Sequence, residues 1–327
     1  MIRTASIAAA ISVLALVSMV VGPAAAAGGA VNLYYAASLK ALNENGVGPA
    51  FQTQTGYTFQ GFPSNSGLIV SELKAKPQLI TPDVVEFADA SLNAQLMGAA
   101  NGNIVKWYAT FARTHLVIGF NANSKYAPMF RKVQQHKLAW YKPLLASGLQ
   151  FGRTDPNSDP KGQTVIFSFD LAQKLYHLKN FATKVLGPIV NPDPTGKNST
   201  SSEVFPEATL VSQLLSGNLD AGVFYLPEAE AAKIPYINLP TEIAFGSPKY
   251  AKLDATQHYT TSAGIKVKGS PVYYTISIPS TVKNEAGAVA FVKFALSKRA
   301  TALGAAIGLQ WVAHKIYGDK KAVPKGI

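Results

Sequence analysis

The stretch VNLYYAASLKAL, residues 31–42, decides the fold class of this chain. Its first residues are rich in β-forming side chains and predict a strand, and a helical pattern follows directly. The same order recurs twice, because predicted strands over 57–62 and 82–87 precede predicted helices over 68–76 and 91–97. Strands that alternate with helices predict an α/β fold with parallel strands.

The alternation continues through the rest of the chain. Further strands are predicted at 115–121, 221–225 and 272–278, and further helices over 165–176 and 284–297. We expect two lobes, joined by crossing segments around 115–121 and 225–229 that form a hinge. The expected division is 28–117 with 228–327 for lobe I, and 118–227 for lobe II.

Two serines lie where a predicted helix follows a predicted strand. Ser38 and Ser66 are expected at N-cap positions, at the edge where α/β sheets bind their ligands. Helix N-termini attract anions because their N–H groups are unpaired and the helix dipole is positive there. Plain helix capping requires the same residue type, so both roles stay open.

Composition restricts the function classes. The chain has 327 residues, of which 48% are hydrophobic and 15% charged, and it has no cysteine. A thiolate nucleophile, a zinc ribbon, an iron–sulfur cluster and a lipid-modified cysteine are therefore excluded. The net charge of +12 favours anionic partners, but the lysines are scattered and no nucleic-acid-binding motif is present, so nucleic acid is not expected as a partner.

Residues 1–27 have the order of a secretory signal peptide. Arg3 is followed by an apolar run over 7–21 and by small residues over 24–27. The run is shorter than the roughly 20 residues that span a bilayer, which argues against a membrane anchor. We expect cleavage near Ala27 and a periplasmic or extracellular protein.

Catalytic signatures are missing from the sequence. The five histidines form no H-E-x-x-H or other close pair, and neither a G-x-S-x-G elbow nor a phosphate-binding G-x-G-x-x-G motif occurs. We therefore expect no enzyme activity and no cofactor. A secreted hydrolase that uses Asp159 and Glu207 as an acid–base pair remains the alternative from another class.

Several stretches together resemble the substrate-binding proteins of molybdate and tungstate ABC transporters, in particular the tungstate-type branch. They are AASL at 36–39, PSNSG at 63–67, FGRTDPNSDPKG at 151–162, PE at 206–207, LDAGVFY at 219–225, VYYTISIPS at 272–280 and AFVKFALS at 290–297. The resemblance implies a type II periplasmic binding protein with two lobes. Each lobe is then a mixed sheet flanked by helices, and the ligand lies in the interlobe cleft.

The resemblance also implies the site residues. Ser38 and Ser66 match the first-lobe hydroxyls, and Asp159, Glu207 and Tyr225 match second-lobe positions. In that branch the two carboxylates reach the metal centre of the bound oxyanion, and no free metal cation is involved. Phosphorus and sulfur do not expand their coordination in this way, so the carboxylates would select molybdate or tungstate over sulfate.

Two segments depart from the pattern of that branch. Asn65-Ser66 stands where a Gly-Ser pair is usual, with Gly67 in place of a basic residue, and 159–164 reads DPKGQT instead of DPCGYR. The predicted function is capture of molybdate or tungstate for an ABC transporter permease by a monomeric protein. A binder of sulfate or phosphate is the nearest alternative, and a sensory or interaction protein without a ligand is another.

Overall fold

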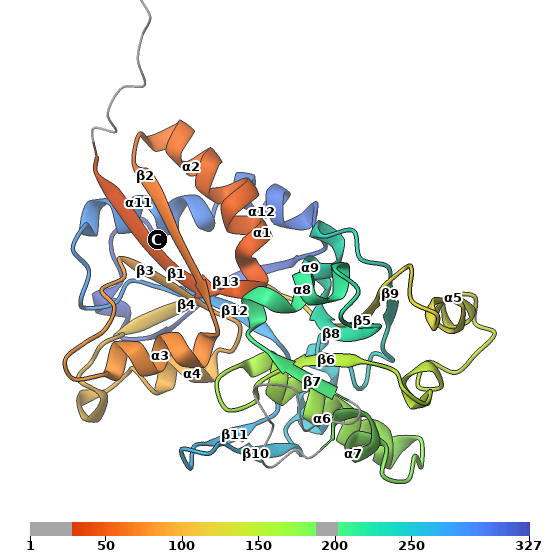
Figure 1. Cartoon of the computed structure of the whole chain (residues 1–327). Coiled ribbons are helices and arrows are strands. Elements are labelled where there is room, and N and C mark those ends of the chain that lie inside the picture. Colours follow the sequence, from red (N-terminus) through yellow and green to blue (C-terminus); the bar gives the residue numbers. More distant parts are fainter. Residues whose placement is uncertain (1–27, 188–201) are drawn as a thin grey trace, which may run out of the picture.

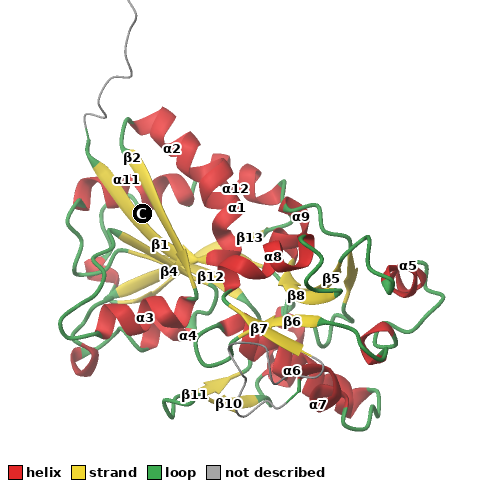
Figure 2. Cartoon of the chain, in the orientation of Figure 1, coloured by secondary structure: helices red, strands yellow, loops and turns green. Residues whose placement is uncertain are grey.

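The computed structural model describes residues 28–187 and 202–327, and in them it contains two large β-sheets with helices around each, together with one small two-stranded sheet (Figure 1; Figure 2). The predicted signal peptide, 1–27, lies outside the described residues. The sheets have the strand orders β13-β4-β12-β3-β1-β2 and β7-β6-β8-β5-β9. This is the two-lobed type II arrangement predicted from the sequence.

The first lobe has a mixed sheet. Strand β1 is parallel to β2 and β3, whereas β12 is antiparallel to β3 and β4. Its strands are β1 (Ala30–Ala36), β2 (Thr58–Ser64), β3 (Val84–Phe87), β4 (Trp107–Arg113), β12 (Tyr273–Ser277) and β13 (Gln310–Gly318). Its helices are α1 (Lys40–Leu42), α2 (Gly48–Thr55), α3 (Ser66–Lys74), α4 (Ser91–Ala94), α11 (Glu285–Ala295) and α12 (Lys298–Ala305).

The second lobe is also mixed, because β6 is parallel to β7 and β8 while β5 is antiparallel to β8 and β9. Its strands are β5 (Leu116–Phe120), β6 (Phe151–Thr154), β7 (Ser202–Phe205), β8 (Ala221–Tyr225) and β9 (Tyr236–Asn238), with a separate hairpin of β10 (His258–Thr260) and β11 (Lys266–Lys268). Its helices are α5 (Ala127–Gln134), α6 (Pro160–Leu175), α7 (Phe181–Leu186), α8 (Glu207–Leu215), α9 (Leu226–Ala231) and α10 (Ala251–Asp254).

Aromatic contacts join neighbouring helices in each lobe. In the first lobe, Phe51 of α2 meets Phe291 of α11 edge-on, with ring centroids 5.1 Å apart. In the second lobe, Phe169 of α6 packs against Phe181 of α7 with centroids 5.0 Å apart. These buried rings fix each lobe as a rigid unit, so the strand ends that carry the candidate site are held in place.

The chain crosses between the sheets at two places. Thr114 follows β4 and leads into β5, and a segment ending at Val272 returns the chain to β12. The two crossings are adjacent, since the Thr114 backbone N donates to the Val272 carbonyl over 3.2 Å. The first crossing lies directly before the predicted segment 115–121, which is mostly β5 itself, and 225–229 is not a crossing, because β9 follows it in the same second sheet.

The expected lobe boundaries change accordingly. Residues 228–327 were expected in lobe I, yet β9 pairs with β5 of the second sheet. The β10–β11 region also contacts the second lobe, where the Ser262 backbone N donates to Asn157 Oδ1 over 2.8 Å. The second lobe therefore extends to the crossing before β12, because the chain adds a strand and a hairpin before it returns.

Helix α6 begins earlier than predicted. It starts at Pro160, directly after Asp159, whose side chain accepts a hydrogen bond from the Lys161 backbone N over 2.8 Å. Proline suits the first helical position, where no N–H partner is needed, so the helix begins before the predicted start at 165. In the described part of the chain, no helix is long and apolar enough to cross a membrane.

Candidate functional site

All five predicted site residues lie where a strand ends and a helix or turn begins. Ser38 lies in a 3₁₀ turn after β1, and Ser66 is the first residue of α3 after β2. Asp159 precedes α6, Glu207 is the first residue of α8 after β7, and Tyr225 ends β8. Figure 1 shows α8 and α9 of the second lobe beside α1 of the first lobe. The strand ends that precede these three helices therefore face one another across the two lobes.

The two lobes are in direct contact beside these residues. Asn65 of the first lobe donates through Nδ2 to Ser158 Oγ over 3.0 Å, and its Oδ1 accepts from the Glu207 backbone N over 3.1 Å. The Gly67 backbone N also donates to the Ser158 carbonyl over 2.9 Å. Ser66 and Asp159 are each next to a residue of this contact, so the first-lobe and second-lobe candidates share one cleft.

Neither serine side chain caps a helix. The residue before α3 is Asn65, so Ser66 lies one position inside the helix, and its Oγ accepts from the Ala88 backbone N over 3.2 Å. Ser38 lies in the middle of its turn, and its Oγ has no hydrogen-bond partner among the described residues. The predicted N-cap positions are therefore wrong, and the buried Ser38 hydroxyl is available for a ligand.

The second-lobe carboxylates surround a buried lysine. Lys161 Nζ lies 2.7 and 2.8 Å from the two oxygens of Glu228 and 3.2 Å from Glu207 Oε1. Asp159 uses Oδ1 to cap α6, while its Oδ2 has no hydrogen-bond partner within the described residues. All four side chains are buried, and three carboxylates against one ammonium leave an excess of negative charge when all are ionised.

These charges shift one another's pKa values. Burial raises the pKa of Asp159 well above its ordinary value, and the negative charge of Glu207 raises it further. Burial also raises the pKa of Glu228, although the Lys161 ammonium opposes this rise. Burial lowers the pKa of Lys161, but the carboxylates outweigh burial and hold that pKa above its ordinary value, so Lys161 stays charged.

Two tyrosines complete the cleft. The hydroxyls of Tyr225 and Tyr274 are buried and lack a hydrogen-bond partner in the parts of the chain that the structure describes. Their rings meet edge-on with centroids 6.3 Å apart. Burial raises the pKa of Tyr274 well above its ordinary value, and the nearby Ser38 hydroxyl opposes this rise.

Sequence reasoning did not identify Tyr274, Glu228 or Lys161 as part of the site. Tyr274 lies in a buried strand, where an aromatic residue is ordinarily a core residue. Glu228 Oε2 accepts from the Tyr225 backbone N over 2.7 Å, and a carboxylate three residues after a strand end is a readable capping signal. The sequence indicated Lys161 only through the departure of 159–164 from the family pattern.

A cavity of about 350 Å³ leads to this cluster from the surface. It runs between the α1 region of the first lobe and helices α8 and α9 of the second. Its lining includes Ser38, Glu207 and Glu228, and also Lys40 and Glu44. The cleft therefore has an opening between the lobes beside the candidate residues.

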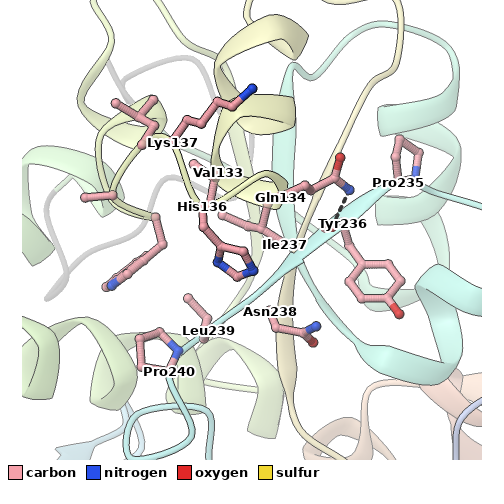
Figure 3. Close-up of a pocket in the computed structure, with 13 residues that line it drawn as sticks. Val133, Gln134, His136, Lys137, Pro235, Tyr236, Ile237, Asn238, Leu239 and Pro240 are labelled. Carbon is pink, nitrogen blue, oxygen red and sulfur yellow. Dashed lines mark hydrogen bonds between the residues drawn. The ribbon is translucent and has the colours of Figure 1, made fainter.

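A second hollow, of about 1020 Å³, lies on the outer side of the second lobe between α5 and β9 (Figure 3). In it Gln134 Nε2 donates to the Tyr236 carbonyl over 2.8 Å, which closes part of the free edge of β9. None of the five candidate residues lines this hollow. Within the described residues, no group of three histidine or carboxylate side chains is placed to hold a metal ion.

Comparison with known proteins identifies the family. The model of the bacterial extracellular solute-binding protein family matches residues 31–310, which is most of the chain. The chain belongs to this family. The solute-binding protein is also similar to a molybdate/tungstate-binding protein of Thermococcus kodakarensis, with 28% identity over 71% of this chain and 67% of that protein. Other relatives align over as little as 56% of their length.

Solved structures agree on the fold of the solute-binding protein. The periplasmic molybdate-binding protein of Azotobacter vinelandii has a TM-score of 0.57 at 18% identity, over 86% of this chain and 99% of that one. The sulfate-binding protein of Mycobacterium tuberculosis H37Rv has the same TM-score at 16% identity, over 87% of each chain. At these identities the likeness shows the two-lobed fold and does not distinguish between ligands.

Proposed function

We propose that this protein captures molybdate or tungstate and presents it to the permease of an ABC transporter. The observation that carries the proposal is the set of buried polar atoms between the lobes. The hydroxyls of Ser38, Tyr225 and Tyr274 and Oδ2 of Asp159 have no hydrogen-bond partner within the described residues. Leaving such groups unpaired costs free energy, so a bound ligand is their natural partner.

The chemistry of these groups suits a tetrahedral metal oxyanion. Neutral hydroxyls donate hydrogen bonds to the oxygens without adding charge, and the first-lobe serines lie at helix starts, where free N–H groups favour anions. A carboxylate repels an oxyanion unless it bonds to the central atom. Molybdenum and tungsten accept additional oxygen ligands, so Asp159 and Glu207 are proposed as those ligands. The name of the Thermococcus relative, a molybdate/tungstate-binding protein, supports the choice of anion.

The proposed transport cycle uses the hinge between the lobes. A signal peptide over 1–27 exports the chain to the periplasm or the exterior, where it acts as a monomer. Binding draws the lobes together about the crossings at Thr114 and Val272, and the permease recognises the closed form. The protein then binds its ligand with its own side chains, needs no cofactor and catalyses no reaction.

Sulfate or phosphate is the second candidate ligand. Lys161 lies 3.2 Å from Glu207 Oε1, which leaves Glu207 less available as a metal ligand. The sulfate-binding neighbour also shares the fold at the same TM-score as the molybdate-binding one. One carboxylate that accepts a hydrogen bond from the O–H of a protonated phosphate suits this alternative, but the alternative does not explain two carboxylates at the cleft.

Isothermal titration calorimetry of residues 28–327 with molybdate, tungstate, sulfate and phosphate tests the proposal. We expect one-to-one binding of molybdate or tungstate, with sulfate at least about 100-fold weaker, which corresponds to roughly 2.7 kcal/mol. Preference for sulfate or phosphate would keep the fold and discard the two carboxylates as metal ligands. No heat with any anion, together with turnover on chromogenic esters or glycosides, would support the hydrolase alternative.

A further inference from the structure

Lys161 is the one residue of the cleft cluster whose charge is opposite to that of its neighbours. It is the second residue of α6, and its side chain is fully buried. Its Nζ also lies 5.6 Å from the centre of the Tyr225 ring, so the ammonium is held against a further site residue. A buried lysine is retained only where its charge is compensated, and here two carboxylates compensate it.

The lysine determines which carboxylate oxygens face the ligand. Both oxygens of Glu228 contact Nζ, and Oε2 of Glu228 is also held by the Tyr225 backbone N. Glu207 Oε1 is the third oxygen within reach of Nζ. Asp159 Oδ2 and Glu207 Oε1 are the buried carboxylate oxygens of this cluster without a hydrogen-bond partner in the described chain, and of the two Glu207 Oε1 has an ion pair with Nζ. The ammonium therefore pairs with two carboxylates, Glu207 and Glu228, and makes no ion pair with the third, Asp159.

Charge balance makes the lysine important for an anionic ligand. Asp159, Glu207 and Glu228 together carry three negative charges when ionised, and Lys161 cancels one of them. Without the ammonium, a doubly charged oxyanion would meet three uncompensated buried carboxylates. Coulomb repulsion scales with the charge of the ligand, so the penalty would be larger for a divalent than for a monovalent anion.

We propose that Lys161 is a positioning residue that shifts the selectivity of the cleft toward divalent over monovalent tetrahedral oxyanions. It acts by compensating and ordering Glu207 and Glu228, and it need not touch the ligand. This inference rests on the proposed function, because it concerns the same site. Lys161 selects ligands by their charge, whereas the proposed carboxylate ligands select them by their central atom.

Tungstate and perrhenate provide a matched pair of probes. Both are tetrahedral metal oxyanions of similar size, but tungstate carries two negative charges and perrhenate one. Affinities of wild type and Lys161→Met are compared by calorimetry or by competition. We expect tungstate to weaken roughly 100-fold and perrhenate roughly 10-fold, because the free energy of repulsion is proportional to ligand charge. Selectivity should thus move about 10-fold toward perrhenate.

A compensating variant separates charge from packing. Lys161→Met with Glu228→Gln restores the formal charge of the wild-type cluster, and the glutamine oxygen can still accept from the Tyr225 backbone N. We expect the double variant to recover most of the tungstate preference. Lys174→Met is the matched control, because Lys174 is an exposed lysine on the same helix and should leave both affinities unchanged.

Each outcome decides the proposal. Equal weakening of both anions in Lys161→Met, unchanged affinities, or no recovery in the double variant would overturn the role of Lys161 while leaving the proposed function intact. A wild type that binds none of the anions overturns the proposed function, and this inference with it. If Lys161→Met does not fold by circular dichroism, Glu228→Gln alone decides, because removal of a negative charge should strengthen tungstate relative to perrhenate.

Discussion

Asn65 of the first lobe accepts, through Oδ1, a hydrogen bond from the backbone N of Glu207 in the second lobe, over 3.1 Å. The same side chain donates to Ser158, the residue before Asp159, over 3.0 Å. One amide thus connects α3 to the start of α8 and to the turn before α6. The positions of both predicted carboxylate ligands therefore depend on how the first lobe meets the second.

Gly67→Ala should weaken ligand binding by hindering this contact between the lobes. A Cβ at Gly67 would lie 2.6 Å from the Ser158 carbonyl oxygen, which is closer than van der Waals contact allows. We expect a loss of about 1–3 kcal/mol in binding, with little effect on the unfolding of either lobe. Gly46→Ala is the control, since its Cβ would lie 3.7 Å from Leu303. Equal affinities in the two variants would contradict the steric argument.

Removal of the serine hydroxyls should separate binding from stability. Ser38→Ala and Ser66→Ala are each expected to cost about 1–3 kcal/mol of molybdate binding, because a buried oxyanion loses a donor. Ser66 Oγ also holds the Ala88 backbone N, so Ser66→Ala should lower thermal stability as well. Ser38→Ala should not, because its hydroxyl has no partner within the described chain. Unchanged calorimetric affinity in both variants would refute the serine assignment.

Asp159→Asn should weaken molybdate and leave sulfate nearly unchanged or improved. The asparagine oxygen can still accept from the Lys161 backbone N and cap α6, so the helix start is preserved. The substitution removes a carboxylate ligand and one negative charge. Asp159→Ala provides the comparison, because it removes the cap too and should cost about 1 kcal/mol of stability. Parallel changes for both anions would exclude metal ligation by Asp159.

The two tyrosine hydroxyls should matter for binding and not for folding. In the described residues neither hydroxyl has a hydrogen-bond partner, so Tyr225→Phe and Tyr274→Phe should leave the ligand-free protein equally or more stable. Both should weaken molybdate by about 1–2 kcal/mol, because a ligand oxygen loses a donor. Thermal unfolding with and without molybdate checks both expectations. A destabilised ligand-free protein would show that the hydroxyls have structural partners.

The buried Glu86 should make the free energy of unfolding depend on pH. This effect does not involve the cleft residues. Burial raises the pKa of Glu86 from 4.5 to about 7, against the opposing hydrogen bond from Asn43. The folded state therefore binds the proton more tightly than the unfolded state between these values, so stability falls as pH rises from about 4.5 through about 7.

Glu86→Gln removes this dependence and keeps an acceptor for the Asn43 amide. Relative to the variant, the wild type should lose up to about 3 kcal/mol of unfolding free energy between pH 4.5 and pH 8. Urea unfolding of both proteins across this range is the measurement. Parallel stability curves would mean that Glu86 does not titrate with a raised pKa.

The sequence predicted the elements that carry local signals. The run 31–35 is β1, and Ala221–Tyr225 is β8 with the same bounds, because short β-rich runs next to helix signals are readable without tertiary context. The start of α6 was missed, since DPKG reads equally as a turn. Strands β4, β6 and β13 were also missed, because sheet pairing and not local propensity decides such segments.

The site divides in a similar way. That Ser38, Ser66, Asp159, Glu207 and Tyr225 lie at strand ends followed from the alternation of elements and from the family resemblance. Tyr274 lies in β12, far from the other site residues in sequence, so the sequence alone did not indicate that it belongs to the site. Side chains far apart in sequence meet only once both sheets have formed.

By itself, the sequence determined two alternating α/β halves, the absence of cysteine chemistry and the strand ends that carry the proposed anion site. The tertiary structure decided where the chain crosses between the lobes, that Asn65 joins them, and that Lys161 lies among three carboxylates. The reason is physical. Secondary structure follows from periodicity along the chain, whereas charge compensation in a buried cleft depends on burial and distance, which exist only in the folded protein.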